Sequence, residues 1–224
     1  MYDKPRFLPA GDSSLVIELG DEISDECNEK VVSRSKELST IKGISEILPT
    51  YRSLLVCYDP SVTDFDAIKT EALEMLKALK ISKMGGRTVE VPVCYGGDFG
   101  PDLRFVAEHN GLSEEEVIEM HSSRSYRVFM LGFLPGFPYL GGMDERIAAP
   151  RLEKPRTRIP AGSVGIAGKQ TGIYPLESPG GWRIIGRTPF RLYDPDAENP
   201  VPIRAGDTIR FVRISKREYE EQTK

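Results

Sequence analysis

The fold is decided by residues 129–194, which read FMLGFLPGFPYLGGMDERIAAPRLEKPRTRIPAGSVGIAGKQTGIYPLESPGGWRIIGRTPFRLYD. Between Gly132 and Pro189 lie 11 of the 21 glycines and 8 of the 17 prolines of the chain. Composition this rich in glycine and proline often marks disorder. Here aromatic and β-branched residues stand between them, which favours short strands and tightly specified loops. Because glycine and proline fix backbone conformation, the stretch is expected to shape a surface.

The segments on either side of this stretch predict the rest of a closed or nearly closed β-barrel, because the strands are short and evenly spaced. Two short helices precede the stretch, at 101–110 and 113–122, and Ser113 to Glu116 reads as a capping box. The expected barrel strands are 88–93, 126–133, 164–167, 182–186, 190–193 and 208–214.

Residues 1–85 read as a separate unit with the order β-β-α-β-β-α. Its first helix is expected to begin after Ser24, and its second after Thr63 or Asp64, with Leu79 among the packing residues. Residues 83–86 then read as a linker. The predicted fold class is α+β, with an N-terminal domain at 1–85, a barrel domain at 87–214 and a charged, frayed tail at 215–224. The expected N-terminal strands are 6–9, 14–19, 44–49 and 54–58.

Composition excludes several classes of protein. The 224 residues carry a net charge of −4 and 39% hydrophobic residues, as in soluble globular proteins. Residues 146–217 are locally basic, but no nucleic-acid-binding signature accompanies them. Cys27, Cys57 and Cys94 share no short spacing, and the chain has only two histidines, so no metal site is expected. Without a secretory or membrane-spanning run, the chain is expected in the cytoplasm.

The sequence contains none of the common catalytic motifs in complete form. Residues 162–169 resemble a phosphate-binding loop, yet Ser163 and Gln170 stand where glycine and Ser or Thr are required. Ser163 and Ser178 have no histidine nearby in sequence. His109 and His121 end the two short helices, where the dipole favours a structural histidine. The chain offers binding groups but no complete catalytic set.

The binding groups lie in the glycine-rich stretch. Arg187, Arg183 and Lys169 are candidates to clamp a carboxylate or phosphate. Trp182 and Tyr174 are expected to wall a pocket or anchor a partner, and residues 132–142 form an alternative docking ridge. Because Trp182 and Arg187 each follow glycine, both are expected to point outward and to serve one shared site rather than stability.

Three motifs carry a resemblance: GFLPGFPYLGG at 132–142, PAGSVGIAG at 160–168 and QTGIYPLESPGGWRIIGRTP at 170–189. They resemble the Kip-inhibitor / allophanate hydrolase subunit 1 family, whose members carry carboxyltransferase subdomains C and D. The resemblance implies a cyclophilin-like barrel but transfers no catalytic residue. The residues expected to bind substrate or partner are Gly136, Phe137, Tyr139, Ser163, Gln170, Thr171, Tyr174, Ser178, Trp182 and Arg187.

The resemblance also implies a function: the B subunit of an ATP-dependent 5-oxoprolinase. The implied partners are a protein similar to the C subunit, which resembles allophanate hydrolase subunit 2, and a LamB-like protein as the A subunit. ATP with magnesium would be a cosubstrate of the complex, not held by this chain alone. Neither nucleic acid nor membrane is an expected partner. Alternatives are an inhibitor that binds a sensor histidine kinase, and a urea carboxylase or allophanate hydrolase component. Proline isomerase ranks last, because a fold does not carry a function.

Overall fold

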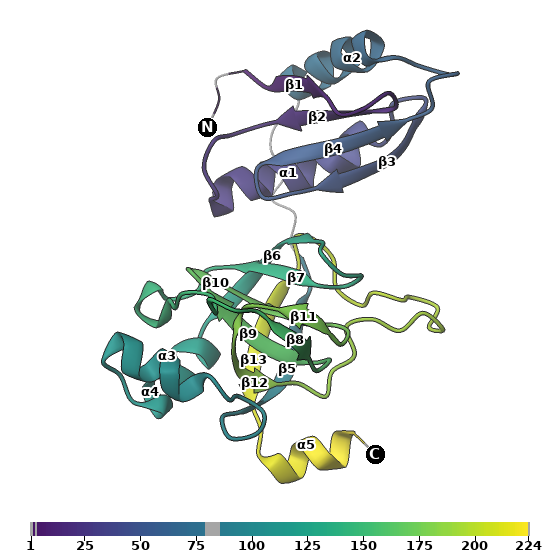
Figure 1. The fold of residues 1–224 in the computed structure, drawn as a ribbon. Coiled ribbons are helices and arrows are strands. Elements are labelled where there is room, and N and C mark those ends of the chain that lie inside the picture. The colour runs from purple at the N-terminus through teal and green to yellow at the C-terminus, as the bar shows by residue number, and fades with distance from the viewer. Residues whose placement is uncertain (1, 3, 79–85, 224) are drawn as a thin grey trace. The chain divides into compact units, whose positions relative to one another are not determined.

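The structure is a computed structural model that describes residues 2, 4–78 and 86–223. Two compact units divide the chain, Met1–Gly85 and Gly86–Lys224, and Figure 1 shows the elements of each. The expected linker residues 83–85 and the expected packing residue Leu79 lie outside the described residues. That the two units fold independently stays a prediction.

The N-terminal unit is an antiparallel sheet packed against helices. Its strands lie side by side in the order β1-β2-β4-β3. Along the chain, the described elements follow the predicted order β-β-α-β-β-α. Their bounds are β1 (Arg6–Pro9), β2 (Ser14–Glu18), α1 (Asp25–Leu38), β3 (Ile44–Pro49), β4 (Ser53–Tyr58) and α2 (Phe65–Ala78).

Side-chain chemistry explains where these helices begin and which faces they bury. The Ser24 hydroxyl accepts a hydrogen bond from the N–H of Cys27 at 3.2 Å, and the Asp64 carboxylate accepts one from the N–H of Ala67 at 2.9 Å. Both cap a helix start that the sequence predicts. Alternate residues of β2 and β4 are buried and pack with apolar residues of both helices. This core includes Leu15, Ile17, Val31, Leu38, Leu54, Val56, Ile68 and Ala72.

The second unit is built on a closed barrel. Within residues 86–223, seven strands follow one another in the order β10-β7-β6-β13-β5-β12-β9, and β9 pairs with β10 to close the ring. Strands β5 and β13 run parallel, and the other neighbours are antiparallel. The predicted fold class is therefore confirmed. The barrel strands are β5 (Thr88–Tyr95), β6 (Ser125–Leu131), β7 (Pro138–Gly141), β9 (Ser163–Ala167), β10 (Gln170–Ile173), β12 (Arg183–Arg187) and β13 (Thr208–Arg213).

The hydrophobic pattern of the sequence does not predict some strands of the central stretch, and it predicts one strand that the described part of the structure does not contain. It did not predict β7, β10 or the separate pair β8 (Arg156–Ile159) and β11 (Ser178–Gly180), which are three or four residues long and defined by their partners. Residues 190–193 were predicted as a strand, and this is wrong. Leu192 is buried, and its carbonyl oxygen lies 2.4 Å from the place of a Cβ on Gly136. The segment therefore packs against the Gly136 turn instead of pairing with a strand.

The helices of the barrel unit follow the sequence more closely. Helices α3 (Leu103–Asn110) and α4 (Glu114–Ser122) are separated by Gly111, whose φ of 67° ends α3, and the capping box of Ser113 and Glu116 is present. Helix α3 packs on β12, and α4 packs on β13.

The C-terminal segment corrects one expectation. Residues 215–224 were expected to fray, but Lys216–Gln222 form helix α5. A second capping box, made by Ser215 and Glu218, starts the helix. The Tyr219 ring then packs on Phe99 with centroids 4.6 Å apart, which attaches the helix to the barrel unit.

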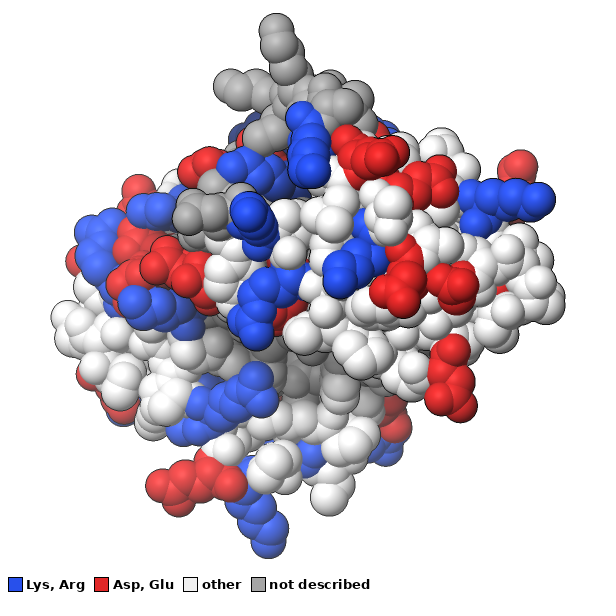
Figure 2. All heavy atoms as spheres, turned by 90° about the horizontal axis from the view of Figure 1, so that it is seen from above, with Lys and Arg blue, Asp and Glu red and all other residues white. Residues whose placement is uncertain are grey.

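Charged side chains of both signs cover the surface seen in Figure 2, where basic and acidic residues are interspersed. Among the described residues, many charged side chains form ion pairs, such as Lys30 with Glu26 at 3.1 Å and Arg104 with Glu108 at 2.8 Å. Exposed pairs of this kind stabilise a fold only slightly. They belong to the solvated surface and do not indicate a functional site.

Candidate functional site

An aromatic pocket of about 270 Å³ lies in the barrel unit. Phe137 is central: its ring lies 5.3 Å from that of Tyr174, 5.5 Å from that of Trp182 and 4.9 Å from that of Tyr139. The rings of Phe137, Tyr174 and Trp182 meet nearly edge to face, a favourable arrangement for aromatic pairs. The wall is thus one interlocked set of rings that come from β7, β10–β11 and the start of β12.

Glycine makes room for these rings. A Cβ on Gly180 would lie 2.4 Å from the Tyr174 hydroxyl oxygen, and a Cβ on Gly172 would lie 3.0 Å from the Phe137 ring. The first distance is closer than real Cβ atoms come, and the second is tight enough that the Phe137 ring would have to shift. The glycines of the 170–181 motif therefore serve the packing of the pocket wall.

Phe133 stands at the mouth of the aromatic pocket. Its side chain is 62% exposed, and its ring lies edge-on to Phe137 at 5.6 Å and to Tyr174 at 6.4 Å. Its φ is 68°, a left-handed value that no other non-glycine residue of the described chain adopts. Such a backbone is costly for a residue with a side chain. The chain thus holds an exposed ring over the pocket at the expense of local strain.

Polar groups of the aromatic pocket are neutral phenols and one cation. Burial raises the pKa of Tyr174 to about 12, opposed by a hydrogen bond from the backbone of Trp182, and burial also raises the pKa of Tyr139. Both hydroxyls are therefore protonated at neutral pH. The Arg151 guanidinium lies 5.9 Å from the Trp182 ring centroid and forms no ion pair with a carboxylate of the described residues. Apolar walls with one uncompensated cation suit a small, flat, anionic molecule.

Four of the expected site residues thus converge, but Trp182 does not behave as predicted. Phe137, Tyr139, Tyr174 and Trp182 line one pocket. Trp182 was expected to point outward, yet it is only 6% exposed and packs against three other rings. The outward direction is therefore wrong, because the glycines before Trp182 turn the indole into the ring cluster.

Arg187 lies elsewhere. It lines a second hollow of about 300 Å³ that shares no residue with the aromatic pocket. Its Nε donates to the carbonyl oxygen of Ala161 at 2.8 Å. The expectation that Arg187 and Trp182 serve one site is therefore not supported by their positions in this chain.

Other expected site residues have structural contacts. Ser163 is buried and donates to the carbonyl of Pro160 at 2.7 Å. The Gly136 turn accommodates Leu192, and Gln170 begins β10 at the barrel surface. Ser178 is buried, and its hydroxyl has no hydrogen-bond partner among the described residues. No histidine accompanies either serine in these contacts.

Thr171 belongs to a buried chain of hydrogen bonds. Its hydroxyl donates to the Gly165 carbonyl at 3.1 Å and lies 2.9 Å from His121 Nε2, so Nε2 carries the proton. His121 Nδ1 then accepts from the Tyr95 hydroxyl at 2.8 Å. Burial lowers the pKa of His121 to about 3. The sequence predicted a structural histidine favoured by the helix dipole, but this one is neutral and is held by Thr171 and Tyr95.

The remaining cations named as oxyanion clamps are already paired. Lys169 forms an ion pair with Glu145 at 2.8 Å. Arg183 lies 3.5 Å from the centroid of the Phe105 ring, donates to the carbonyl of Pro150 and lies 3.9 Å from Asp102. Residues 163–167, part of the segment that resembles a phosphate loop, form β9, a fully buried barrel strand. That segment therefore does not fit a nucleotide.

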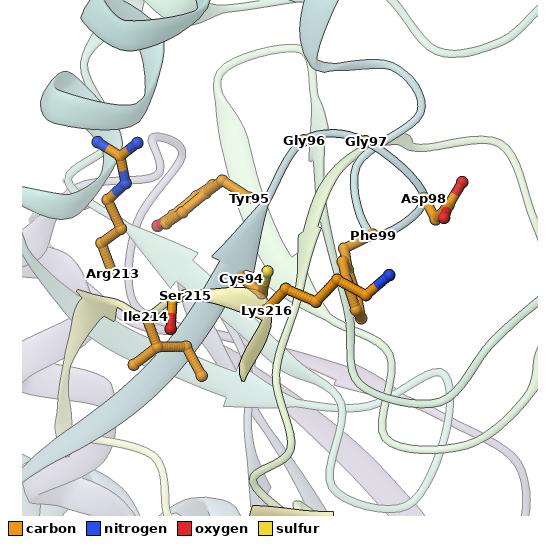
Figure 3. A pocket seen from close by; sticks show the side chains of 10 residues that line it. All are labelled: Cys94, Tyr95, Gly96, Gly97, Asp98, Phe99, Arg213, Ile214, Ser215 and Lys216. Carbon is orange, nitrogen blue, oxygen red and sulfur yellow. The ribbon is translucent and has the colours of Figure 1, made fainter. Parts of the chain in front are cut away.

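A larger hollow of about 590 Å³ lies between the Gly96–Gly97 loop and the start of α5, as Figure 3 shows. Most of its polar side chains are committed: Tyr95 to His121, Arg213 to Glu115, and Ser215 to the cap of α5. The Cys94 thiol faces it, but burial raises the pKa of this thiol and leaves it a poor nucleophile. Size alone does not make this hollow the better candidate.

Two features bear on metals and membranes. Within residues 2, 4–78 and 86–223, no three His, Cys, Asp or Glu side chains are grouped so that they would hold a metal ion. Over the same residues, no helix combines the length and apolar character that crossing a bilayer requires.

Sequence reasoning missed Arg151 as a member of the aromatic pocket. It lies in an irregular segment outside the three motifs, and only the folded chain brings it to Trp182. Nothing in its local sequence signals this contact.

Comparison with known proteins identifies the family. The model of the carboxyltransferase domain, subdomain C and D, matches residues 5–203. The B subunit of the Bacillus subtilis 5-oxoprolinase is 47% identical over 222 residues, which cover 93% of this chain and 92% of that protein. The same subunit from Haemophilus influenzae is 40% identical over 205 residues, or 92% and 96% of the two chains. A putative urea carboxylase of Emericella nidulans is more distant, at 29% identity over 146 residues, 61% of this chain and 12% of that protein.

Solved structures share the fold of this chain. The structure of TTHA0988 is 38% identical with a TM-score of 0.80, and the match covers 90% of this chain but only 40% of that longer one. PH0987 from Pyrococcus horikoshii is 53% identical with a TM-score of 0.59, covering 96% of this chain and 100% of that one. The chain belongs to the carboxyltransferase-domain family, subdomains C and D, and its relatives at 40–47% identity are B subunits of 5-oxoprolinase.

Proposed function

We propose that this chain is the B subunit of an ATP-dependent 5-oxoprolinase and that its aromatic pocket binds 5-oxoproline. One observation carries the proposal: 47% identity to the corresponding Bacillus subtilis protein over nearly the full length of both chains. The urea carboxylase relative is far more distant and matches over a small part of its own length. Because the relatives are named as one component of a larger enzyme, their names support action within a complex.

The chemistry of the aromatic pocket suits this substrate. 5-Oxoproline is a five-membered lactam that carries a carboxylate. Its flat ring fits against the wall formed by Tyr139, Tyr174 and Trp182, and its carboxylate pairs with the guanidinium of Arg151. A pocket of about 270 Å³ is large enough for such a molecule.

This chain contributes binding and orientation in the proposed reaction, which opens the lactam C–N bond to give glutamate with ATP hydrolysis. The buried serines, Ser163 and Ser178, form no hydrogen bond with a histidine, and His121 is neutral and held at both ring nitrogens. Activation of water therefore falls to the partners, a protein similar to allophanate hydrolase subunit 2 and a LamB-like protein. ATP with magnesium enters as a cosubstrate of the complex, and no residue of this chain is assigned to it.

Reconstitution tests this proposal. Glutamate release from 5-oxoproline is measured with the purified chain alone, with each partner and with both. We expect ATP-dependent release only when both partners are present. Release at a comparable rate by the chain alone would contradict the division of labour. An assembled complex that consumes ATP with urea but not with 5-oxoproline would contradict the substrate. Inhibition of a sensor histidine kinase, with no effect of the partners on glutamate release, would instead support the inhibitor alternative.

A further inference from the structure

The hollow around Arg187 has features that the proposed function does not use. It measures about 300 Å³, and its walls include Gly162, Thr188, Arg191 and Tyr193. None of its lining residues lines the aromatic pocket. The Arg187 hollow is therefore separate from the aromatic pocket to which the proposed function is assigned.

Arg187 is held rigidly by its own backbone surroundings. It ends β12, and its Nε donates to the Ala161 carbonyl at 2.8 Å. A Cβ on Gly162 would lie 2.3 Å from the Thr188 carbonyl oxygen, so only glycine lets the 160–162 turn lie against residues 187 and 188. This close approach brings the Ala161 carbonyl to the guanidinium. One edge of the guanidinium is thus fixed, and the N–H groups of both terminal nitrogens remain to donate.

The charge of Arg187 is not compensated within the described chain. Its side chain is half-buried, and it forms no ion pair with a carboxylate of the described residues. Most other arginines do, including its neighbour Arg191, which lies 3.2 Å from Asp194. Removing a guanidinium partly from water without a counter-charge is unfavourable. A bound anion would relieve this cost.

The other walls add donors for an anion. The Thr188 hydroxyl accepts from the N–H of Phe190 at 3.0 Å, which leaves its own hydrogen free to donate. Arg191 lies at the rim, where its side chain is 81% exposed, but it is already paired with Asp194 and is not counted as a ligand. A fixed guanidinium beside a hydroxyl donor matches an oxygen anion, which guanidinium binds through two parallel hydrogen bonds.

We propose that the Arg187 hollow binds a small-molecule oxyanion, a phosphate or a carboxylate, with the terminal nitrogens of Arg187 as the main ligand. Phosphate and carboxylate present the same paired oxygens to the guanidinium. A carboxylate on a partner protein is a different occupant, which the test separates from small anions.

The test uses the full chain at constant ionic strength. Inorganic phosphate or sodium acetate replaces chloride, and binding is followed by the backbone amide signals of residues 187–191 and by the melting temperature. Binding to the folded state raises the melting temperature in a saturable way. We expect phosphate, acetate or both to bind the wild type. Arg187→Met should raise the apparent Kd for that anion at least tenfold. Arg187→Lys keeps the charge but loses the paired geometry, so it falls between the two.

Arg204→Met is the matched control, because Arg204 is exposed, forms no ion pair within the described chain and lines none of these pockets. It should bind anions as the wild type does. Arg151→Met removes the cation of the aromatic pocket and should leave the anion response of the amide signals of residues 187–191 unchanged. Equal binding by wild type and Arg187→Met would overturn the proposal. The proposal would also be overturned if the wild type responded to neither anion. This includes the case in which Arg187→Met impairs assembly with partners but the chain binds no small anion. If Arg187→Met does not fold, Arg187→Lys takes its place in the test. Wild-type affinity for the anion in Arg187→Lys would then also overturn the proposal.

Discussion

The two units of this chain use their residues differently. In the N-terminal unit, helices and strands pack through a regular apolar pattern, and left-handed φ values occur at Gly11 and Gly43. In the barrel unit, left-handed residues are more numerous, and Phe133 is held at the mouth of the aromatic pocket. Two of its arginines without ion-pair partners in the described chain, Arg151 and Arg187, line pockets. Regular packing supports a fold, whereas backbone irregularity together with uncompensated charge marks the places where a ligand is expected.

The largest expected effect comes from Trp182→Ala. Because Trp182 is buried among Phe137, Tyr139 and Tyr174, its loss should cost about 3–5 kcal/mol of stability in the barrel unit. Thermal unfolding with amide-resolved readout should show lower stability in the barrel while the N-terminal unit keeps its own. A melting temperature close to that of the wild type would show that the ring cluster does not support the barrel.

A pair of glycines sharpens the comparison. Gly136 and Gly11 have nearly equal φ values of 80° and 81°, but a Cβ on Gly136 meets the Leu192 carbonyl oxygen at 2.4 Å and one on Gly11 meets nothing within 4 Å. Gly11→Ala should cost about 1 kcal/mol through backbone strain alone. Gly136→Ala adds overpacking and should cost about 3 kcal/mol. Denaturant titration of both variants measures the difference, and equal losses would contradict the close approach.

The third effect is a difference between the two units in how their stability depends on pH. Burial lowers the pKa of His121 to about 3, so the unfolded chain binds a proton that the folded chain refuses. Stability is therefore full above about pH 6.5 and falls as the pH drops towards 3, by about 2 kcal/mol between pH 7 and pH 5. His121→Gln keeps a donor and an acceptor for Thr171 and Tyr95 and should flatten this slope. Both histidines of the chain, His109 and His121, lie in the barrel unit, so the N-terminal unit has no such slope. An unchanged slope in the variant would contradict the assignment.

Much of the fold follows from local chemistry. Ser24, Asp64 and Ser113 mark helix starts because their side chains cap the first turn, and alternation in β2 and β4 marks a sheet with one buried face. Local chemistry does not predict strands β7, β10 and β11. Their glycines and prolines interrupt the alternation of apolar and polar residues, and pairing with strands distant in sequence defines them.

The candidate site divides in the same way. The motifs singled out Phe137, Tyr139, Tyr174 and Trp182, and the structure brings them together. The same motifs also contain Ser163 and Thr171, whose buried hydrogen bonds hold the barrel, so a motif alone does not separate packing from binding. Arg151 reaches the aromatic pocket through the tertiary fold, which no spacing along the chain reveals.

The central claim, that the aromatic pocket binds 5-oxoproline through Arg151, is tested most directly by steady-state kinetics of the assembled complex. Arg151→Met should raise the KM for 5-oxoproline about tenfold or more, with the melting temperature unchanged, because it removes a charge-assisted contact. Arg104→Met, on an exposed face of α3, should leave the KM unchanged. A KM for Arg151→Met equal to that of the wild type would contradict the claim.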